Sequence, residues 1–161
     1  MTYGVGIVVG GVFAALSLVH VYWALGGTVG LESAIPRIPS TRGAHAIDRV
    51  PASDGALVRA FHPSAAMTLA VAGALGMVAV LVCLRAGLFA PARVHGWLRA
   101  SLAALAVILL ARAVGDLKLV GFFKRIKGTR FAELDTWLYA PLCVLLALGL
   151  VLLVSTTPCR A

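Results

Sequence analysis

The sequence carries little charge for its length. Only 12% of its 161 residues are Asp, Glu, Lys or Arg, whereas 61% are apolar. A soluble domain usually contains about 25% charged residues, so the composition excludes an ordinary soluble enzyme. The mean hydropathy of +0.99, with apolar runs of about 20 residues, the length that crosses a bilayer, indicates a polytopic membrane protein.

Cysteine is also scarce. Cys83, Cys143 and Cys159 lie in separate segments, which excludes a disulfide framework and argues against thiol redox chemistry. No His, Cys or carboxylate residues recur at the spacing of metal ligands, and His20 is the only histidine within an apolar run. We therefore expect no metal and no other cofactor. The motifs of covalent serine catalysis are absent too.

Acidic residues are the rarer charged class, with 6 against 14 Lys and Arg, and the formal net charge is +8. No nucleic-acid-binding motif accompanies this excess. On so apolar a chain, the positive charge is better explained by membrane orientation and contact with anionic headgroups. We expect membrane lipids as partners and no nucleic acid.

Four apolar runs predict an all-α fold, a polytopic four-helix bundle that occupies residues 1–161 as one membrane domain. The first run lacks the basic start and the cleavage site of a signal peptide, so we expect it to be retained. The expected spans and connections are, approximately, 3–25, 63–84, 96–115 and 135–154, with a loop at 26–62 and a connector at 116–134.

The long first loop, 26–62, contains three prolines and no sustained apolar period. Connections of this length are usually functional or mobile. We interpret it as a lid over a cavity, or as the site of a short interfacial helix near residues 55–61. Plain flexibility is the alternative.

Basic residues predict the orientation in the membrane. The loop 26–62 and the connector 116–134 share one side of a four-span protein and hold four and five Lys or Arg residues, against four on the other side. Cytoplasmic segments retain such an excess. We expect a protein of the bacterial cytoplasmic (inner) membrane, with both loops in the cytoplasm and both termini outside.

This topology brings three span ends to the same membrane face, and unusual polar and aromatic side chains gather there. Helical spacing puts some of them on shared faces, at three or four positions apart. They are His20, Tyr22 and Trp23 on the first span, Arg112 and Asp116 on the third, and Glu133, Asp135 and Tyr139 at the fourth.

Ionisable groups at membrane depth are costly unless they find partners, so these are candidate catalytic residues. Arg112 and Asp116 are spaced to form an ion pair, which would make Asp116 an orienting base. Asp135, buried against aromatic rings, would stay protonated and act as the acid, with Glu133 a lesser candidate. The alternatives are a structural Arg112–Asp116 pair, a helix-capping Asp135 and a packing role for His20.

Aromatic side chains are expected to bind the substrate. Trp23, Phe123 and Tyr139 would line a cavity and stabilise a cationic intermediate through their ring faces, with Tyr22 and Phe122 nearby. Such a site suits a lipophilic small molecule, and isoprenoid cyclisation, isomerisation or epoxide opening would fit it. Membrane-bound terpene cyclases are similar in general character only.

The connector alternates aromatic and basic side chains. This pattern is typical of a segment in the headgroup plane, with its charges on lipid phosphates. The alternative is a phosphate or pyrophosphate site for the substrate. The basic candidates are Lys118, Lys124, Arg125, Lys127 and Arg130.

Two further patterns concern helix packing. Pro141 lies early in the fourth span, where it would leave a carbonyl unpaired and kink the helix near Tyr139. Gly6 and Gly10 have the Gly-x-x-x-Gly spacing, which Ala14 extends, and such a face favours helix contacts. A homo-oligomer is possible on this basis.

Several motifs together resemble a family of small four-span bacterial membrane proteins of unknown function, over nearly the whole chain. The resemblance implies the four-helix architecture and no reaction. The motifs are His20-Val-Tyr-Trp-Ala-Leu-Gly-Gly27, Arg112-Ala-Val-Gly-Asp116, Val120-Gly-Phe-Phe-Lys124, Thr129-Arg-Phe-Ala-Glu-Leu-Asp-Thr136 and Tyr139-Ala-Pro-Leu-Cys143.

The leading hypothesis is a membrane-embedded enzyme that uses intramembrane carboxylates for acid–base chemistry on a lipophilic substrate. A small proton-coupled transporter or a lipophile-binding protein is the alternative, and a non-catalytic accessory subunit is the third. A transporter usually carries its polar site at mid-depth, whereas these candidates cluster at one face.

Overall fold

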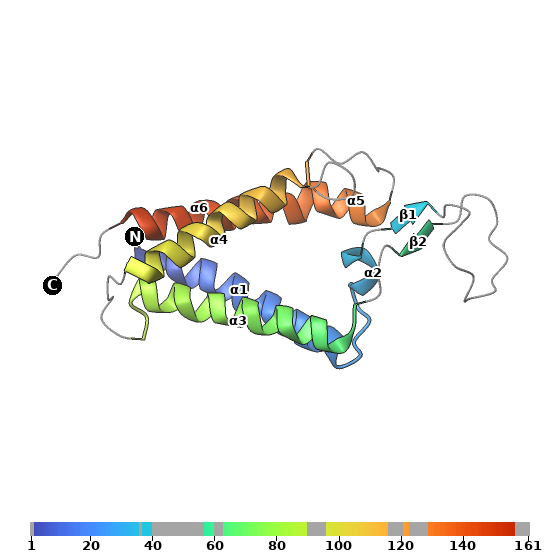
Figure 1. The fold of residues 1–161 in the computed structure, drawn as a ribbon, viewed down its shortest axis with the longest axis horizontal. Coiled ribbons are helices and arrows are strands. Elements are labelled where there is room, and N and C mark those ends of the chain that lie inside the picture. Colours follow the sequence, from blue (N-terminus) through green and yellow to red (C-terminus); the bar gives the residue numbers. More distant parts are fainter. Residues whose placement is uncertain are drawn as a thin grey trace.

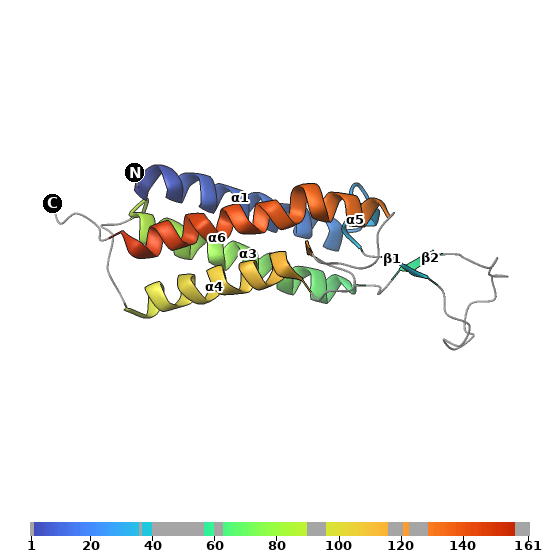
Figure 2. The same cartoon turned by 90° about the horizontal axis from the view of Figure 1, so that it is seen from above.

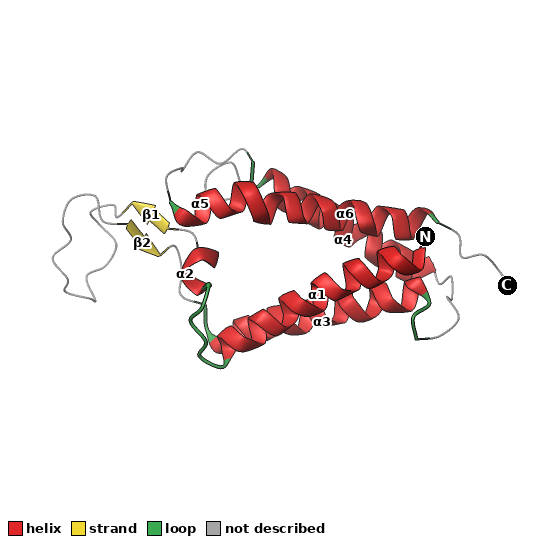
Figure 3. Ribbon diagram, turned by 180° about the vertical axis from the view of Figure 1, so that it is seen from behind, coloured by secondary structure: helices red, strands yellow, loops and turns green. Residues whose placement is uncertain are grey.

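The computed structural model describes residues 2–35, 37–39, 57–59, 63–89, 96–115, 121–122 and 129–156. Four of its helices are long and apolar enough to cross a membrane, which confirms the all-α, four-span fold (Figure 3). They are α1 (Thr2–Ala24), α3 (Ala65–Ala86), α4 (Gly96–Val114) and a continuous helix, Arg130–Ser155, that comprises α5 (Arg130–Leu134), the π-turn η1 (Asp135–Tyr139) and α6 (Ala140–Ser155).

The spanning helices form two pairs that make a V. Helix α1 packs along α3, and α4 packs along α6, as Figure 1 shows. The pairs meet at the end where α1 starts and α6 finishes, and they diverge toward α2 (Leu31–Ala34) and α5. We call these the closed end and the open end. Figure 2 shows the helices from above, running lengthwise beside one another.

The core lies toward the closed end, where all four spans contribute buried side chains such as Val9, Val82, Leu102 and Leu150. The close approach of the two pairs depends on Gly149, since a Cβ there would lie 2.5 Å from Val9 Cγ2. Only a residue without a side chain lets α6 approach α1 so closely.

The glycine spacing in α1 serves packing within the chain. A Cβ on Gly6 would lie 2.2 Å from Ala86 Cβ, and one on Gly10 would lie 3.1 Å from Cys83 Sγ. Both glycines therefore face α3, whereas Ala14 is exposed. The predicted small-residue contact exists between α1 and α3, and a homo-oligomer stays a prediction.

A buried cation closes the same end of the molecule. Arg85, in the last turn of α3, is buried and donates a hydrogen bond from Nη2 to the carbonyl oxygen of Thr156. This bond joins the C-terminal ends of α3 and α6. The outer faces of the spans are apolar, as a lipid contact requires; Leu18, Val107 and Leu145 are each more than 60% exposed, at 69%, 66% and 65%.

The first loop contains structure that the sequence did not predict. Helix α2 follows Gly30, which has a left-handed φ of 76°, and β1 (Arg37–Pro39) pairs antiparallel with β2 (Leu57–Arg59). The expected interfacial helix near residues 55–61 is therefore wrong. Ile38 lies opposite Val58 in the register of this pair. The lid interpretation rests mainly on residues 40–56, which lie outside the described residues.

Candidate functional site

The three span ends that carry the candidate residues lie together at the open end, because α1 finishes, α4 finishes and α5 begins there (Figure 1). The V nevertheless divides them between its two pairs. His20 and Trp23 belong to the α1/α3 pair, whereas Arg112 and Asp135 belong to the α4/α6 pair. Two separate local sites result.

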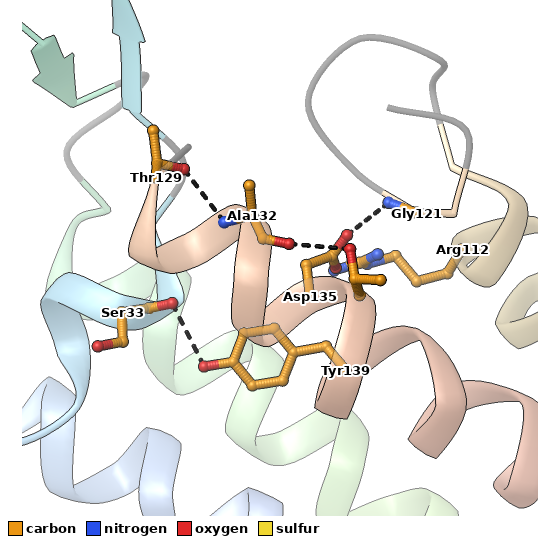
Figure 4. Close-up of polar contacts among 8 residues, drawn as sticks. Ser33, Arg112, Gly121, Thr129, Ala132, Asp135 and Tyr139 are labelled. Carbon is orange, nitrogen blue, oxygen red and sulfur yellow. Dashed lines mark hydrogen bonds and ion pairs between the residues drawn. The ribbon is translucent and has the colours of Figure 1, made fainter. Parts of the chain in front are cut away.

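The first site centres on Asp135, whose side chain is fully buried. Its Oδ1 accepts a hydrogen bond from Arg112 Nη2 at 2.9 Å, and its Oδ2 accepts one from the backbone N–H of Gly121 at 2.6 Å (Figure 4). Charge-assisted bonds of this kind are short and strong. They join the end of α4, the connector and the fourth span.

Gly121 fits this position for a steric reason. Its φ is 87°, and a Cβ there would lie 2.3 Å from the carbonyl oxygen of Val114. The next residue, Phe122, donates its backbone N–H to the carbonyl oxygen of Ala113 at 2.9 Å. Gly121 and Phe122 are thereby held against the end of α4, with the amide of Gly121 aimed at the carboxylate of Asp135.

This geometry changes the roles expected for the acidic residues. In the described part of the chain Arg112 pairs with Asp135, while Asp116, its expected partner, lies outside the described residues. A guanidinium and a peptide N–H both donate to Asp135, and this arrangement suits a carboxylate. The proton-donor role proposed for Asp135 thus loses its basis, because that role required a carboxyl group away from any cation.

Asp135 is not the helix cap either. The helix starts earlier, at Arg130, and Thr129 caps it by accepting the backbone N–H of Ala132 at 3.1 Å. Asp135 lies in the second turn and starts the π-turn η1. Its buried side chain therefore serves contacts with other segments and not the start of its own helix.

A π-turn lies directly before Pro141 in the fourth span. The backbone N–H of Ala140 donates to the carbonyl oxygen of Asp135, five residues earlier. The kink expected from Pro141 stays a prediction. Turns of the π type occur frequently at functional sites, and here Asp135 and Tyr139 point to different partners (Figure 4).

Tyr139 connects the two helix pairs across the open end. Its hydroxyl donates to the carbonyl oxygen of Ser33 in α2 at 3.3 Å, and its ring lies 6.1 Å from that of Phe131. Glu133, Arg130 and Phe122 are exposed. These three side chains do not join the buried contacts of Asp135.

The second site is a partly open cavity of about 320 Å³ lined by α1, α2 and the start of α3. We call it the His20 cavity. Apolar side chains form most of its lining, and only a few polar atoms reach it. The lining includes His20, Trp23, Ala34, Ile35 and Thr68.

Hydrogen bonds within the chain hold the polar side chains of the His20 cavity. His20 Nδ1 lies 2.8 Å from the carbonyl oxygen of Leu16, and its ring meets Trp23 edge-on, with centroids 5.0 Å apart. Trp23 Nε1 donates to the carbonyl oxygen of Val29 at 2.8 Å. Thr68 Oγ1 donates to the carbonyl oxygen of Ser64 at 3.0 Å.

The structure brings together only part of the predicted site. His20 and Trp23 share a cavity, Arg112 and Asp135 share an ion pair, and Tyr22 is exposed. The remaining candidates lie outside the described residues. They are Asp116, Lys118, Phe123, Lys124, Arg125 and Lys127.

Sequence reasoning missed the other side of the cavity. Ala34, Ile35 and Thr68 carry no motif, and only the packing of α2 and α3 against α1 places them there. Gly121 was visible within the motif Val120-Gly-Phe-Phe-Lys124, but its backbone contact with Asp135 depends on the tertiary fold. Within the described ranges, no three His, Cys, Asp or Glu residues gather where a metal ion could be held.

A family model described as "Protein of unknown function (DUF3995)" matches residues 13–150. No curated protein and no solved structure matches the chain.

Proposed function

The chain belongs to the DUF3995 family, and because the function of that family is unknown we propose one from the structure: the protein binds a lipophilic small molecule in the His20 cavity. The observation that carries this proposal is the cavity itself, about 320 Å³ of mainly apolar space lined by α1, α2 and α3. Cavities of about 300–1,000 Å³ with few polar groups are typical of small-molecule sites.

The location of the cavity favours a lipophile that arrives from the membrane. Its lining belongs to the ends of α1 and α3 and to α2, close to one bilayer face. The described side chains that line it include no Asp, Glu, Lys or Arg. A strongly charged ligand would find no partner there and would lose its hydration.

Acid–base catalysis on a lipophilic substrate is the second candidate, and His20 supports it. Among the described lining residues, His20 is the one whose side chain type commonly serves as a general acid or base. Asp135 supports it less than the sequence suggested, because its carboxylate is paired with Arg112 on the other side of the V. In this reading, His20 would accept a proton from the bound substrate.

We place the protein in the bacterial cytoplasmic membrane with the open end in the cytoplasm. The loop and the connector at that end hold nine Lys and Arg residues, against four near the closed end. The positive-inside rule supports this orientation. It would put the mouth of the His20 cavity at the cytoplasmic face.

The test is native mass spectrometry of the purified protein, with extraction and identification of whatever remains bound. Ala34→Trp would fill the cavity, and Ala14→Trp makes the same change on an exposed part of α1. We expect a specific lipophile on the wild type and on Ala14→Trp, with occupancy reduced about tenfold or more by Ala34→Trp. Equal occupancy in all three proteins, or bulk phospholipid alone, would contradict the proposal.

A further inference from the structure

Given the proposed function, on which this inference rests, we infer that the His20 cavity selects an apolar alcohol: a lipophile whose single polar group donates a hydrogen bond. The cavity thereby discriminates against an ether, an aldehyde or a ketone of the same shape. This selectivity follows from the hydrogen-bond donors and acceptors that remain unused in the lining.

The first step is the tautomer of His20. Its Nδ1 lies 2.8 Å from the carbonyl oxygen of Leu16, and a carbonyl oxygen can only accept. Nδ1 must therefore carry the hydrogen, and in a neutral imidazole the other ring nitrogen, Nε2, then has a free lone pair.

The second step is that the other side-chain donors are already used. Trp23 Nε1 donates to Val29 at 2.8 Å, and Thr68 Oγ1 donates to Ser64 at 3.0 Å. Thr68 still offers the remaining acceptor capacity of its hydroxyl oxygen. The polar side chains of the described lining thus present acceptors, at His20 Nε2 and Thr68 Oγ1, and no unused donor.

A ligand hydroxyl complements this lining, since it can donate to His20 Nε2. An ether or a carbonyl oxygen can only accept, so it would face a lone pair and form no hydrogen bond with either acceptor. Sites that bond a ligand hydroxyl discriminate against analogues that lack it, because that hydrogen bond is lost.

The same lining argues against a phosphorylated lipid. The described residues around the His20 cavity include no Lys or Arg, and a phosphate or pyrophosphate would need such donors. The predicted phosphate-binding role of the connector therefore has no counterpart at this cavity. The free alcohol fits it better than the phosphate ester.

The experiment compares three probes of one carbon skeleton: farnesol, farnesyl methyl ether and farnesal. Each is titrated into the purified full-length protein in detergent at pH 8, and bound probe is counted by native mass spectrometry. We expect the wild type to bind farnesol about tenfold more tightly than the ether or the aldehyde.

Two variants of His20 test the assignment to Nε2. His20→Phe keeps a ring against Trp23 but removes the acceptor, so farnesol should fall to the affinity of the ether. His20→Gln adds a donor as well as an acceptor, so farnesal should gain affinity and approach farnesol. Gel filtration and circular dichroism show whether each variant is folded, and either variant alone suffices.

The outcomes separate the two proposals. Equal binding of all three probes by the wild type would overturn the alcohol selectivity and leave the lipophile-binding function standing. A preference for farnesol that persists in both His20 variants would also overturn the selectivity argument. If no probe binds and the Ala34→Trp change has no effect on co-purified lipophiles, both proposals fail.

Discussion

Asp135 illustrates how a buried charge in a membrane span is accommodated. Its two oxygens have separate partners, Arg112 at 2.9 Å and the Gly121 amide at 2.6 Å. Such pairing is what ionisable groups within a membrane require. Since the ion pair joins α4 to the fourth span, we assign it the positioning of the connector and of the helix that carries Tyr139.

Breaking this pair should destabilise the protein. Removing one partner of a buried pair leaves the other charge uncompensated, at a cost of about 3–5 kcal/mol. Because the Arg112 side chain is 36% exposed, we expect a smaller loss, about 2 kcal/mol, in the free energy of unfolding for Asp135→Asn. The measurement is reversible unfolding in mixed micelles, followed by circular dichroism.

A double-mutant cycle with Arg112→Gln distinguishes pairing from general damage. The double variant should lose less than the two single variants together, with a coupling of about 1 kcal/mol or more. Glu133→Gln removes an exposed carboxylate from the same helix and should change stability by less than about 0.5 kcal/mol. Additive losses would show that Arg112 and Asp135 do not stabilise one another.

At the scale of the helices, the pairing of α1 with α3 depends on the absence of side chains on one stripe of α1. In Gly6→Ala, the new Cβ would lie 2.2 Å from Ala86 Cβ, so the helices must separate or shift. Overpacking of this kind costs about 1–3 kcal/mol. We expect a loss of that size in the same unfolding measurement.

Gly11→Ala is the matched control for this prediction. It lies on the same helix and gains the same helix propensity, but a Cβ there meets nothing within 4 Å. Its stability should stay within about 0.5 kcal/mol of the wild type or rise slightly. Equal effects at Gly6 and Gly11 would mean that the α1/α3 contact is not as close as the structure shows.

For the whole molecule, the start of α1 and the end of α6 lie together at the closed end (Figure 1). Our orientation puts this end outside the cytoplasm. Alkaline phosphatase, which folds only outside the cytoplasm, should therefore be active when fused after Ala161 in a bacterial host. Its insertion into the full chain after Gly115, at the open end, should give no activity.

Green fluorescent protein at the same two positions gives the complementary readout. It should fluoresce when inserted after Gly115 and not when fused after Ala161. An insertion after Phe89, near the closed end between α3 and α4, should behave like the C-terminal fusion. The reverse pattern at all three sites would invert the orientation and move the mouth of the His20 cavity to the outer face.

The sequence by itself determined the membrane spans and the end of the bundle at which the polar residues lie. Hydropathy and length were sufficient for this, because a span needs about 20 apolar residues whatever it packs against. The family resemblance agreed with this architecture and added no activity.

Only the tertiary structure decided which polar residues meet. Sequence spacing favoured Arg112 with Asp116, because local pairs can be read from helix geometry, while the contact with Asp135 spans 23 residues and depends on how α4 packs on the fourth span. The V then put His20 and Asp135 on different helix pairs. The separation arises because the close approach at Gly149 joins the two pairs at the closed end. At the open end, the hydrogen bond from Tyr139 to Ser33 of α2 connects them.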